Sequence, residues 1–122
     1  MADFNEVQIQ KVWEKGVVDK NNDQNVFRKD VADAWIKRDQ YGKKDEPFGW
    51  EIDHVYPQSK GGNENIINLR PMHWENNQSK GDDYPDYRAV KTSEGDKNIN
   101  KSATMTVNKD LQSELQKIYR IK

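Results

Sequence analysis

The stretch WEIDHVYPQSKGGNENIINLRPMHWENNQSKGD, residues 50–82, decides how this chain folds, and it contains both histidines of the sequence. Its first part, residues 50–57, alternates apolar with polar side chains before it reaches a proline. Such alternation is typical of a half-buried strand, and proline tends to end one. We therefore predict a short strand at the start of this stretch.

The rest of the stretch predicts a loop, a second strand and a helix. Residues 58–65 are polar and contain two adjacent glycines, which is typical of a loop. The apolar run at residues 66–70 predicts a short strand. Residues 71–80 predict a helix, because Pro71 would stand in its first turn and Gly81 just past its end.

Three polar side chains share one face of the predicted helix. His73, Asn77 and Lys80 recur at the spacing that aligns side chains along a helix. If this helix packs against the strands, the face that carries these three side chains is directed toward Asp53 and His54. Neighbouring residues of a regular strand point to opposite faces, so we expect irregular backbone where these two side chains turn toward one point.

The order and spacing of Asp53-His54, Asn68, Asn77 and Lys80 resemble the motif of the HNH endonucleases, the ββα-metal fold, in its His-Asn-Asn variant. The segment before the motif also resembles small stand-alone bacterial and phage members of that family. That looser likeness rests on Trp13, Arg28, Asp30, Trp35, Tyr41-Gly42 and Gly49-Trp50.

The resemblance implies a role for each residue of the motif. His54 would be the general base that activates a water molecule, since the ordinary pKa of histidine, ~6.5, suits that task near neutral pH. Asp53 and Asn77 would hold a divalent cation on the scissile phosphate and the departing 3′ oxygen. Asn68, the second catalytic residue, would hydrogen-bond across the loop and fix the hairpin, with the ring of His54 as a further partner. Lys80 would contact a phosphate, and the alternative is a solvated surface charge.

The donor set indicates which cation to expect. One carboxylate and one carboxamide are oxygen ligands, which suit Mg²⁺ with waters completing its shell. Mn²⁺ or Ca²⁺ would suit the same donors, while Zn²⁺ or Ni²⁺ would use the imidazoles of His54 and His73. For His73 two interpretations stay open, a metal or substrate contact and a packing residue.

The chain has no cysteine, which excludes disulfide-linked partners and thiolate zinc sites. Many HNH proteins hold a structural zinc with paired cysteines beside the motif. In this chain His73 and Asn76 stand where the second pair would be. We therefore expect no structural zinc.

Charge is distributed unevenly along a chain whose net charge is −1. Residues 51–85 carry more acidic than basic side chains, which suits a divalent cation, whereas residues 86–122 carry more basic ones, which suit DNA phosphates. The sequence has no apolar run of ~18 residues and no basic or apolar leader at its N-terminus. We expect no membrane contact and a cytoplasmic location, in a bacterium or a phage-infected host cell.

The flanking segments predict further elements. Apolar residues at helical spacing indicate helices at residues 4–15 and 26–40. Residues 83–101 are polar and predict a loop, and residues 104–107 a short strand. Asn108 is a suitable cap for a C-terminal helix with a second apolar stripe.

Together these predictions describe one α+β domain over residues 1–122. It has a helical lead at 1–49, the ββα motif at 50–82, and a loop and C-terminal helix at 83–122. We expect a metal-dependent endonuclease that hydrolyses phosphodiester bonds in DNA. The alternative is a non-catalytic nucleic-acid-binding or structural module that retains the ββα fold.

Overall fold

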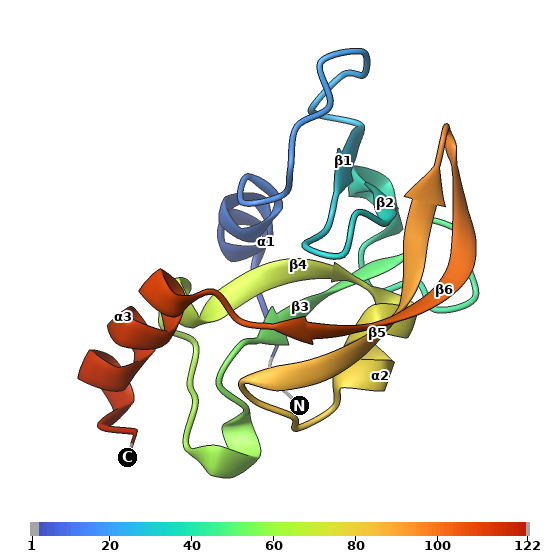
Figure 1. Cartoon of the computed structure of the whole chain (residues 1–122). Coiled ribbons are helices and arrows are strands. Elements are labelled where there is room, and N and C mark those ends of the chain that lie inside the picture. Colours follow the sequence, from blue (N-terminus) through green and yellow to red (C-terminus); the bar gives the residue numbers. More distant parts are fainter. Residues whose placement is uncertain (1–2, 122) are drawn as a thin grey trace.

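The computed structural model describes residues 3–121 and has an α+β fold, which confirms the predicted class (Figure 1). This part of the chain forms three antiparallel two-stranded sheets and three α-helices. The helices are α1 (Glu6–Trp13), α2 (Trp74–Lys80) and α3 (Lys109–Tyr119). The strands are β1 (Phe27–Lys29), β2 (Trp35–Lys37), β3 (Trp50–His54), β4 (Leu69–His73), β5 (Asp86–Glu94) and β6 (Lys97–Thr106).

The hairpin of β3 and β4 lies at the centre of the molecule, and α2 follows β4 directly (Figure 1). Its register pairs Trp50 with His73 at one end and His54 with Leu69 at the other. The loop between these strands contains two short 3₁₀ turns, Gln58–Lys60 and Ile66–Asn68. Strand, loop, strand and helix therefore follow one another in the predicted order.

The start of α2 differs from the prediction. Pro71 belongs to β4, opposite Ile52, and the helix begins only at Trp74. A two-stranded sheet leaves one edge of each strand unpaired, so a proline that lacks the amide donor is tolerated there. The end of the helix is as predicted, because Gly81 caps it with φ +52°.

The helix predicted at residues 26–40 is wrong, since this segment forms β1, β2 and a 3₁₀ turn, Arg38–Gln40. The side chain of Asp30 accepts hydrogen bonds from the amides of Ala32 and Ala34, which closes a tight turn between the strands. Asp33 then has φ +67°, a conformation that an α-helix does not contain. Of the apolar residues that fit a helical stripe, Phe27 and Trp35 lie on the two strands, and Val31 and Ala34 lie between the strands.

The loop predicted at residues 83–101 is also wrong. Most of this segment forms the long hairpin of β5 and β6, which continues to Thr106 and so includes most of the predicted strand at 104–107 (Figure 1). Glu94 pairs with Lys97 across the tip, where Gly95 has φ +63°. Polar side chains fill these strands, so hydrophobic alternation gave no signal for them.

The terminal helices form as predicted because their caps are local. Asn5 and Gln8 make a reciprocal capping box at the start of α1. The side chain of Asn108 accepts a hydrogen bond from the amide of Leu111 at the start of α3. Each helix therefore has its first free amides satisfied by a side chain a few residues away.

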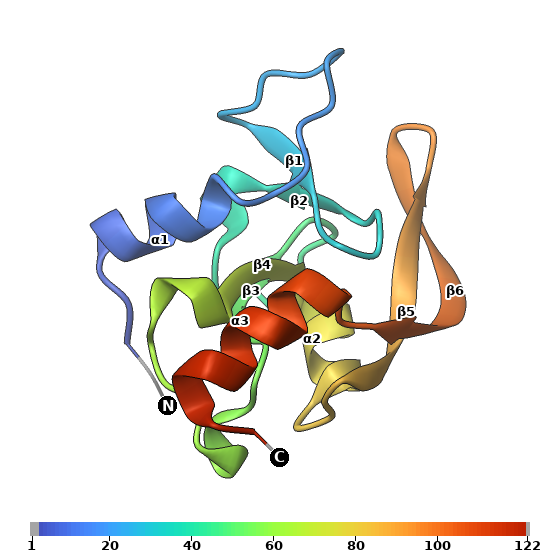
Figure 2. The same cartoon turned by 60° about the vertical axis from the view of Figure 1, so that its left-hand side comes forward.

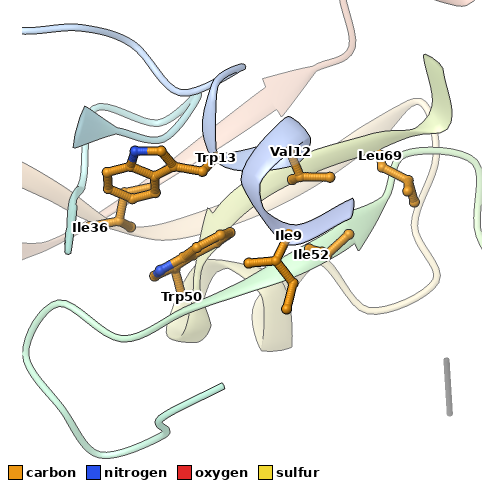
Figure 3. Packing of buried hydrophobic residues seen from close by; sticks show 7 residues of the cluster. All are labelled: Ile9, Val12, Trp13, Ile36, Trp50, Ile52 and Leu69. Atoms are coloured by element: carbon orange, nitrogen blue, oxygen red, sulfur yellow. The ribbon is translucent and has the colours of Figure 1, made fainter. Parts of the chain in front are cut away.

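Two apolar clusters hold the central hairpin between the flanking elements. Helix α1 covers one side (Figure 3) through a cluster of Ile9, Val12, Trp13, Ile36, Trp50, Ile52 and Leu69. Helix α3 and the β5–β6 hairpin (Figure 2) contribute to a second cluster of Val55, Met72, Tyr87, Val107 and Leu115. None of the helices within residues 3–121 combines the length and apolar content needed to span a bilayer.

Candidate active site

The end of β3 and the side of α2 enclose a polar hollow of about 200 Å³. Asp53, His54 and Asn77 all line it, so the structure brings together three of the residues singled out in the sequence. Its remaining walls are Ile52, Pro57, Gln58, Gly81 and Asp82. A broader hollow of about 610 Å³ shares His54 and Asn77 and extends along Glu51 toward Lys44 and Tyr41.

The backbone at Asp53 and His54 is regular, which corrects the expected irregularity. The β3–β4 register runs without a shift from Trp50 to His54. His54 is the last residue of β3. Both side chains line the hollow because it lies at the end of the strand, where the chain turns away.

His54 uses one ring nitrogen for the fold. Its Nε2 donates to the Oε2 of Glu64 at 3.1 Å, and the ring lies 6.0 Å from that of Phe4, measured between centroids. Since a carboxylate only accepts, the proton of the neutral ring belongs on Nε2 and Nδ1 keeps its lone pair. No residue between 3 and 121 makes a hydrogen bond to that nitrogen. His54 therefore has a free base at the edge of the hollow.

Asp53 is buried and faces two cations. One carboxylate oxygen lies 3.0 Å from the Nε of Arg70, and the other lies 3.2 Å from the Nζ of Lys80. Arg70 is itself held over the ring of Tyr87, 5.2 Å from its centroid. A carboxylate offers about four lone-pair positions, so these contacts leave room for a further partner from the hollow.

Lys80 lies beneath the site, and the predicted phosphate contact is wrong. Its side chain is fully buried, and its ammonium donates to the backbone carbonyl of His54 at 3.2 Å besides pairing with Asp53. Burial lowers the pKa of Lys80, while the Asp53 carboxylate opposes that shift. The ammonium is thus used to hold two neighbouring residues of β3.

Asn77 faces β3 from α2, and its Nδ2 donates to the Oε1 of Glu51 at 3.3 Å. The sequence reasoning missed Glu51. The signal was available, because side chains two apart on a strand share a face and Asp53 is two residues further on. The carboxamide oxygen of Asn77 has no hydrogen-bond donor among residues 3–121.

The residues at the hollow fit a hard cation better than a soft one. Asp53, Asn77 and Glu51 supply carboxylate and carboxamide oxygens, which Mg²⁺, Mn²⁺ and Ca²⁺ prefer. Residues 3–121 contain no cluster of three or more histidine, aspartate and glutamate side chains that could hold a metal ion. His73 is four residue pairs from His54 along the hairpin, about 13 Å, so the two imidazoles do not form a joint site for Zn²⁺ or Ni²⁺.

Asn68 is fully buried and holds the loop between β3 and β4. Its Oδ1 accepts from the amide of Tyr56 at 2.7 Å, while its Nδ2 donates to the carbonyls of Tyr56 and Asn63 at 3.0 and 3.2 Å. The predicted hydrogen bonds across the loop are therefore present. None of them reaches the ring of His54, so Asn68 supports the hairpin from behind.

His73 lies outside the hollow, and the structure supports the packing interpretation. Its Nδ1 accepts from the amide of Glu75, which caps α2, and its Nε2 donates to the carbonyl of Pro47 at 3.0 Å. Both ring nitrogens are used, so the predicted metal or substrate contact is wrong. Burial lowers the pKa of His73.

A network of buried hydrogen bonds surrounds His73. Asp30 accepts hydrogen bonds from the amide of His73 and from the Nδ2 of Asn76, both at 3.0 Å. Asn76 in turn accepts from the amides of Val90 and Lys91 through its Oδ1. This hydrogen-bond network connects the β1–β2 turn, α2 and β5.

Comparison with known proteins identifies the same segment. Residues 45–86 match a family model described as HNH endonuclease, and they include β3, β4, α2 and every residue of the predicted site. No curated protein and no solved structure matches the chain. This segment of the chain is therefore similar to the HNH endonucleases.

Proposed function

We propose that this protein is a metal-dependent endonuclease that hydrolyses phosphodiester bonds in DNA. The observation that carries the proposal is the convergence of a free imidazole nitrogen on His54 with the oxygen donors of Asp53 and Asn77 around one hollow. A base and a set of hard ligands at one point are what hydrolysis of a phosphodiester needs.

His54 acts as the general base in this proposal. Its Nδ1 takes a proton from a water molecule, and the water oxygen forms a bond to phosphorus. The bond from phosphorus to the 3′ oxygen breaks, and the departing oxygen takes up a proton from solvent. The products are a 5′-phosphate and a 3′-hydroxyl.

Asp53 and Asn77 would hold a divalent cation, with Mg²⁺ as the first choice. When bound, the cation stabilises negative charge on the scissile phosphate and on the departing oxygen. Glu51 holds the amide of Asn77 and so orients its carboxamide oxygen toward the hollow. Arg70 and Lys80 hold the carboxylate of Asp53 in place.

Cleavage of supercoiled plasmid by the purified protein tests the function. We expect Mg²⁺-dependent nicking or linearisation that EDTA stops, that His54→Ala loses, and that His73→Asn retains. His73→Asn is the matched control because asparagine is also a good helix N-cap. If the wild-type protein binds DNA but cuts none of it with Mg²⁺ or Mn²⁺, the non-catalytic alternative holds instead.

A further inference from the structure

Glu64 is the one side chain within residues 3–121 that hydrogen-bonds to the ring of His54, at 3.1 Å. From this contact we infer that Glu64 is a positioning residue, which holds the His54 ring with its proton on Nε2 and its free Nδ1 facing the hollow. The inference rests on the proposed function, in which that nitrogen is the base. Sequence reasoning gave Glu64 no role, since it lies in the polar loop between the two strands of the motif.

The loop holds Glu64 from both sides. Before it, the carbonyl of Asn63 accepts from the Nδ2 of Asn68 at 3.2 Å. After it, the side chain of Asn65 accepts from the amide of Ile67 at 3.0 Å and caps the 3₁₀ turn Ile66–Asn68. Because both neighbours are fixed, the backbone of Glu64 is held at a position from which its carboxylate reaches the ring.

The C-terminal helix braces the same loop from outside. The hydroxyl of Tyr119, at the end of α3, donates to the Oδ1 of Asn63 at 2.6 Å and accepts from the amide of Asn63 at 3.2 Å. The ring of Tyr119 stacks on that of Tyr56, with 5.3 Å between centroids. Elements far apart in the chain thus fix the residue next to Glu64.

Close contact inside the loop also requires a glycine. A Cβ at Gly62 would lie 1.8 Å from the carbonyl oxygen of Tyr56 and 2.9 Å from the Nδ2 of Asn68. Both are atoms of the hydrogen bonds that Asn68 makes across the loop. Any side chain at this position would push the Tyr56 and Asn68 sides of the loop apart and would move Glu64.

The carboxylate of Glu64 has two effects on the base. A neutral histidine exchanges its proton between both nitrogens, and an acceptor at Nε2 favours the form whose lone pair is on Nδ1. When Nδ1 takes the proton of the attacking water, the ring becomes a cation beside a carboxylate. The hydrogen bond from Nε2 then strengthens, because both partners are charged.

Two Glu64 variants separate these effects. Glutamine keeps an acceptor oxygen and loses the charge, whereas alanine loses both. We expect Glu64→Ala to lower kcat on the order of 10-fold to 100-fold, with KM for DNA unchanged, and Glu64→Gln to lower kcat by less. Glu114→Ala, on the exposed side of α3, is the matched control and keeps the wild-type rate.

Long-range ¹H–¹⁵N NMR of the imidazoles at pH 8 reads the position of the proton directly, and two histidines give a simple spectrum. We expect His54 of the wild type to carry its proton on Nε2, and Glu64→Ala to show a mixture of both forms. His73 is the internal reference and keeps its proton on Nε2 in every variant.

An unchanged His54 signal together with an unchanged kcat in Glu64→Ala would overturn the inference. A wild-type protein that does not cleave DNA would instead refute the proposed function. In that case the NMR measurement alone still decides whether Glu64 holds the ring.

Discussion

His54 and His73 occupy opposite ends of one hairpin and use their rings in opposite ways. His54 ends β3, lines the hollow, hydrogen-bonds through Nε2 and has no hydrogen bond to Nδ1 from residues 3–121. His73 ends β4, is 1% exposed and uses both nitrogens, one to cap α2 and one to bind Pro47. The comparison teaches that a histidine near a motif serves chemistry only when the fold leaves one of its nitrogens free.

The largest expected effect is on catalysis by His54. Positioned general bases contribute on the order of 10² to 10⁴ in rate. His54→Ala should therefore lose about 3 to 5 kcal/mol of transition-state stabilisation, measured as kcat for plasmid cleavage at saturating Mg²⁺. Mn²⁺ and DNA binding should stay at wild-type levels. A variant that keeps its rate within threefold would mean that another group activates the water.

Asp53, the neighbour of His54, should affect both the metal and the fold. Asp53→Asn keeps the shape but removes the charge that compensates Arg70 and Lys80, so we expect a loss of about 3 kcal/mol in the free energy of unfolding. Mn²⁺ binding, followed by calorimetry below the unfolding temperature, should weaken at least about tenfold. His54→Ala is the control, and equal Mn²⁺ affinity in both variants would contradict the assignment of Asp53.

His73 should affect stability and leave the chemistry alone. His73→Ala removes the cap of α2 and a buried hydrogen bond to Pro47, so the free energy of unfolding should fall by about 2 kcal/mol. His73→Asn restores an acceptor for the amide of Glu75 and should recover about half of that loss. Chemical denaturation measures both, and the folded fraction of each variant should cut DNA at the wild-type rate.

The smallest effect is the pH dependence that His73 adds to stability. Burial lowers its pKa in the folded protein, so the unfolded chain takes up a proton first as the pH falls. The stability that the protein gains by burying neutral His73 is therefore fully present above about pH 6.5, the ordinary pKa of histidine. It is lost as the pH drops below that value. Denaturation midpoints at pH 7.5 and 5.5 should differ more for the wild type than for His73→Asn. Equal differences in the two proteins would show that His73 does not titrate in this range.

Local signals determined three parts of the fold. The caps Asn5 and Asn108 lie within a few residues of the amides they satisfy, so α1 and α3 could be predicted. Alternation, a glycine pair and Gly81 likewise predicted the β3–β4 hairpin and the end of α2. The spacing of the motif predicted that Asp53, His54 and Asn77 would meet, because strand, turn and helix geometry carry such spacing into space.

Tertiary contacts decided the segments that the sequence reasoning got wrong. Asp30 closes the turn between β1 and β2 locally with one carboxylate oxygen, and its other oxygen accepts from His73 and Asn76, which come from a distant part of the chain. The side chains of the β5–β6 hairpin are mostly polar, so their sequence pattern did not indicate strands. Strand β5 is held by hydrogen bonds from its backbone amides to the side chain of Asn76. These contacts join residues that are far apart in the chain, and local periodicity does not reveal such contacts.

The site divides in the same way. From the sequence alone, the residue types and spacing of the motif indicated the resemblance to the HNH endonucleases and singled out the proposed base and oxygen donors. Only the tertiary structure decided which polar groups are free to act. It buries Lys80 beneath Asp53 and places Glu64 within hydrogen-bonding distance of His54. Both ring nitrogens of His73 make hydrogen bonds within the fold. The physical reason is that a polar group removed from water must find a partner, and the partner is chosen by packing.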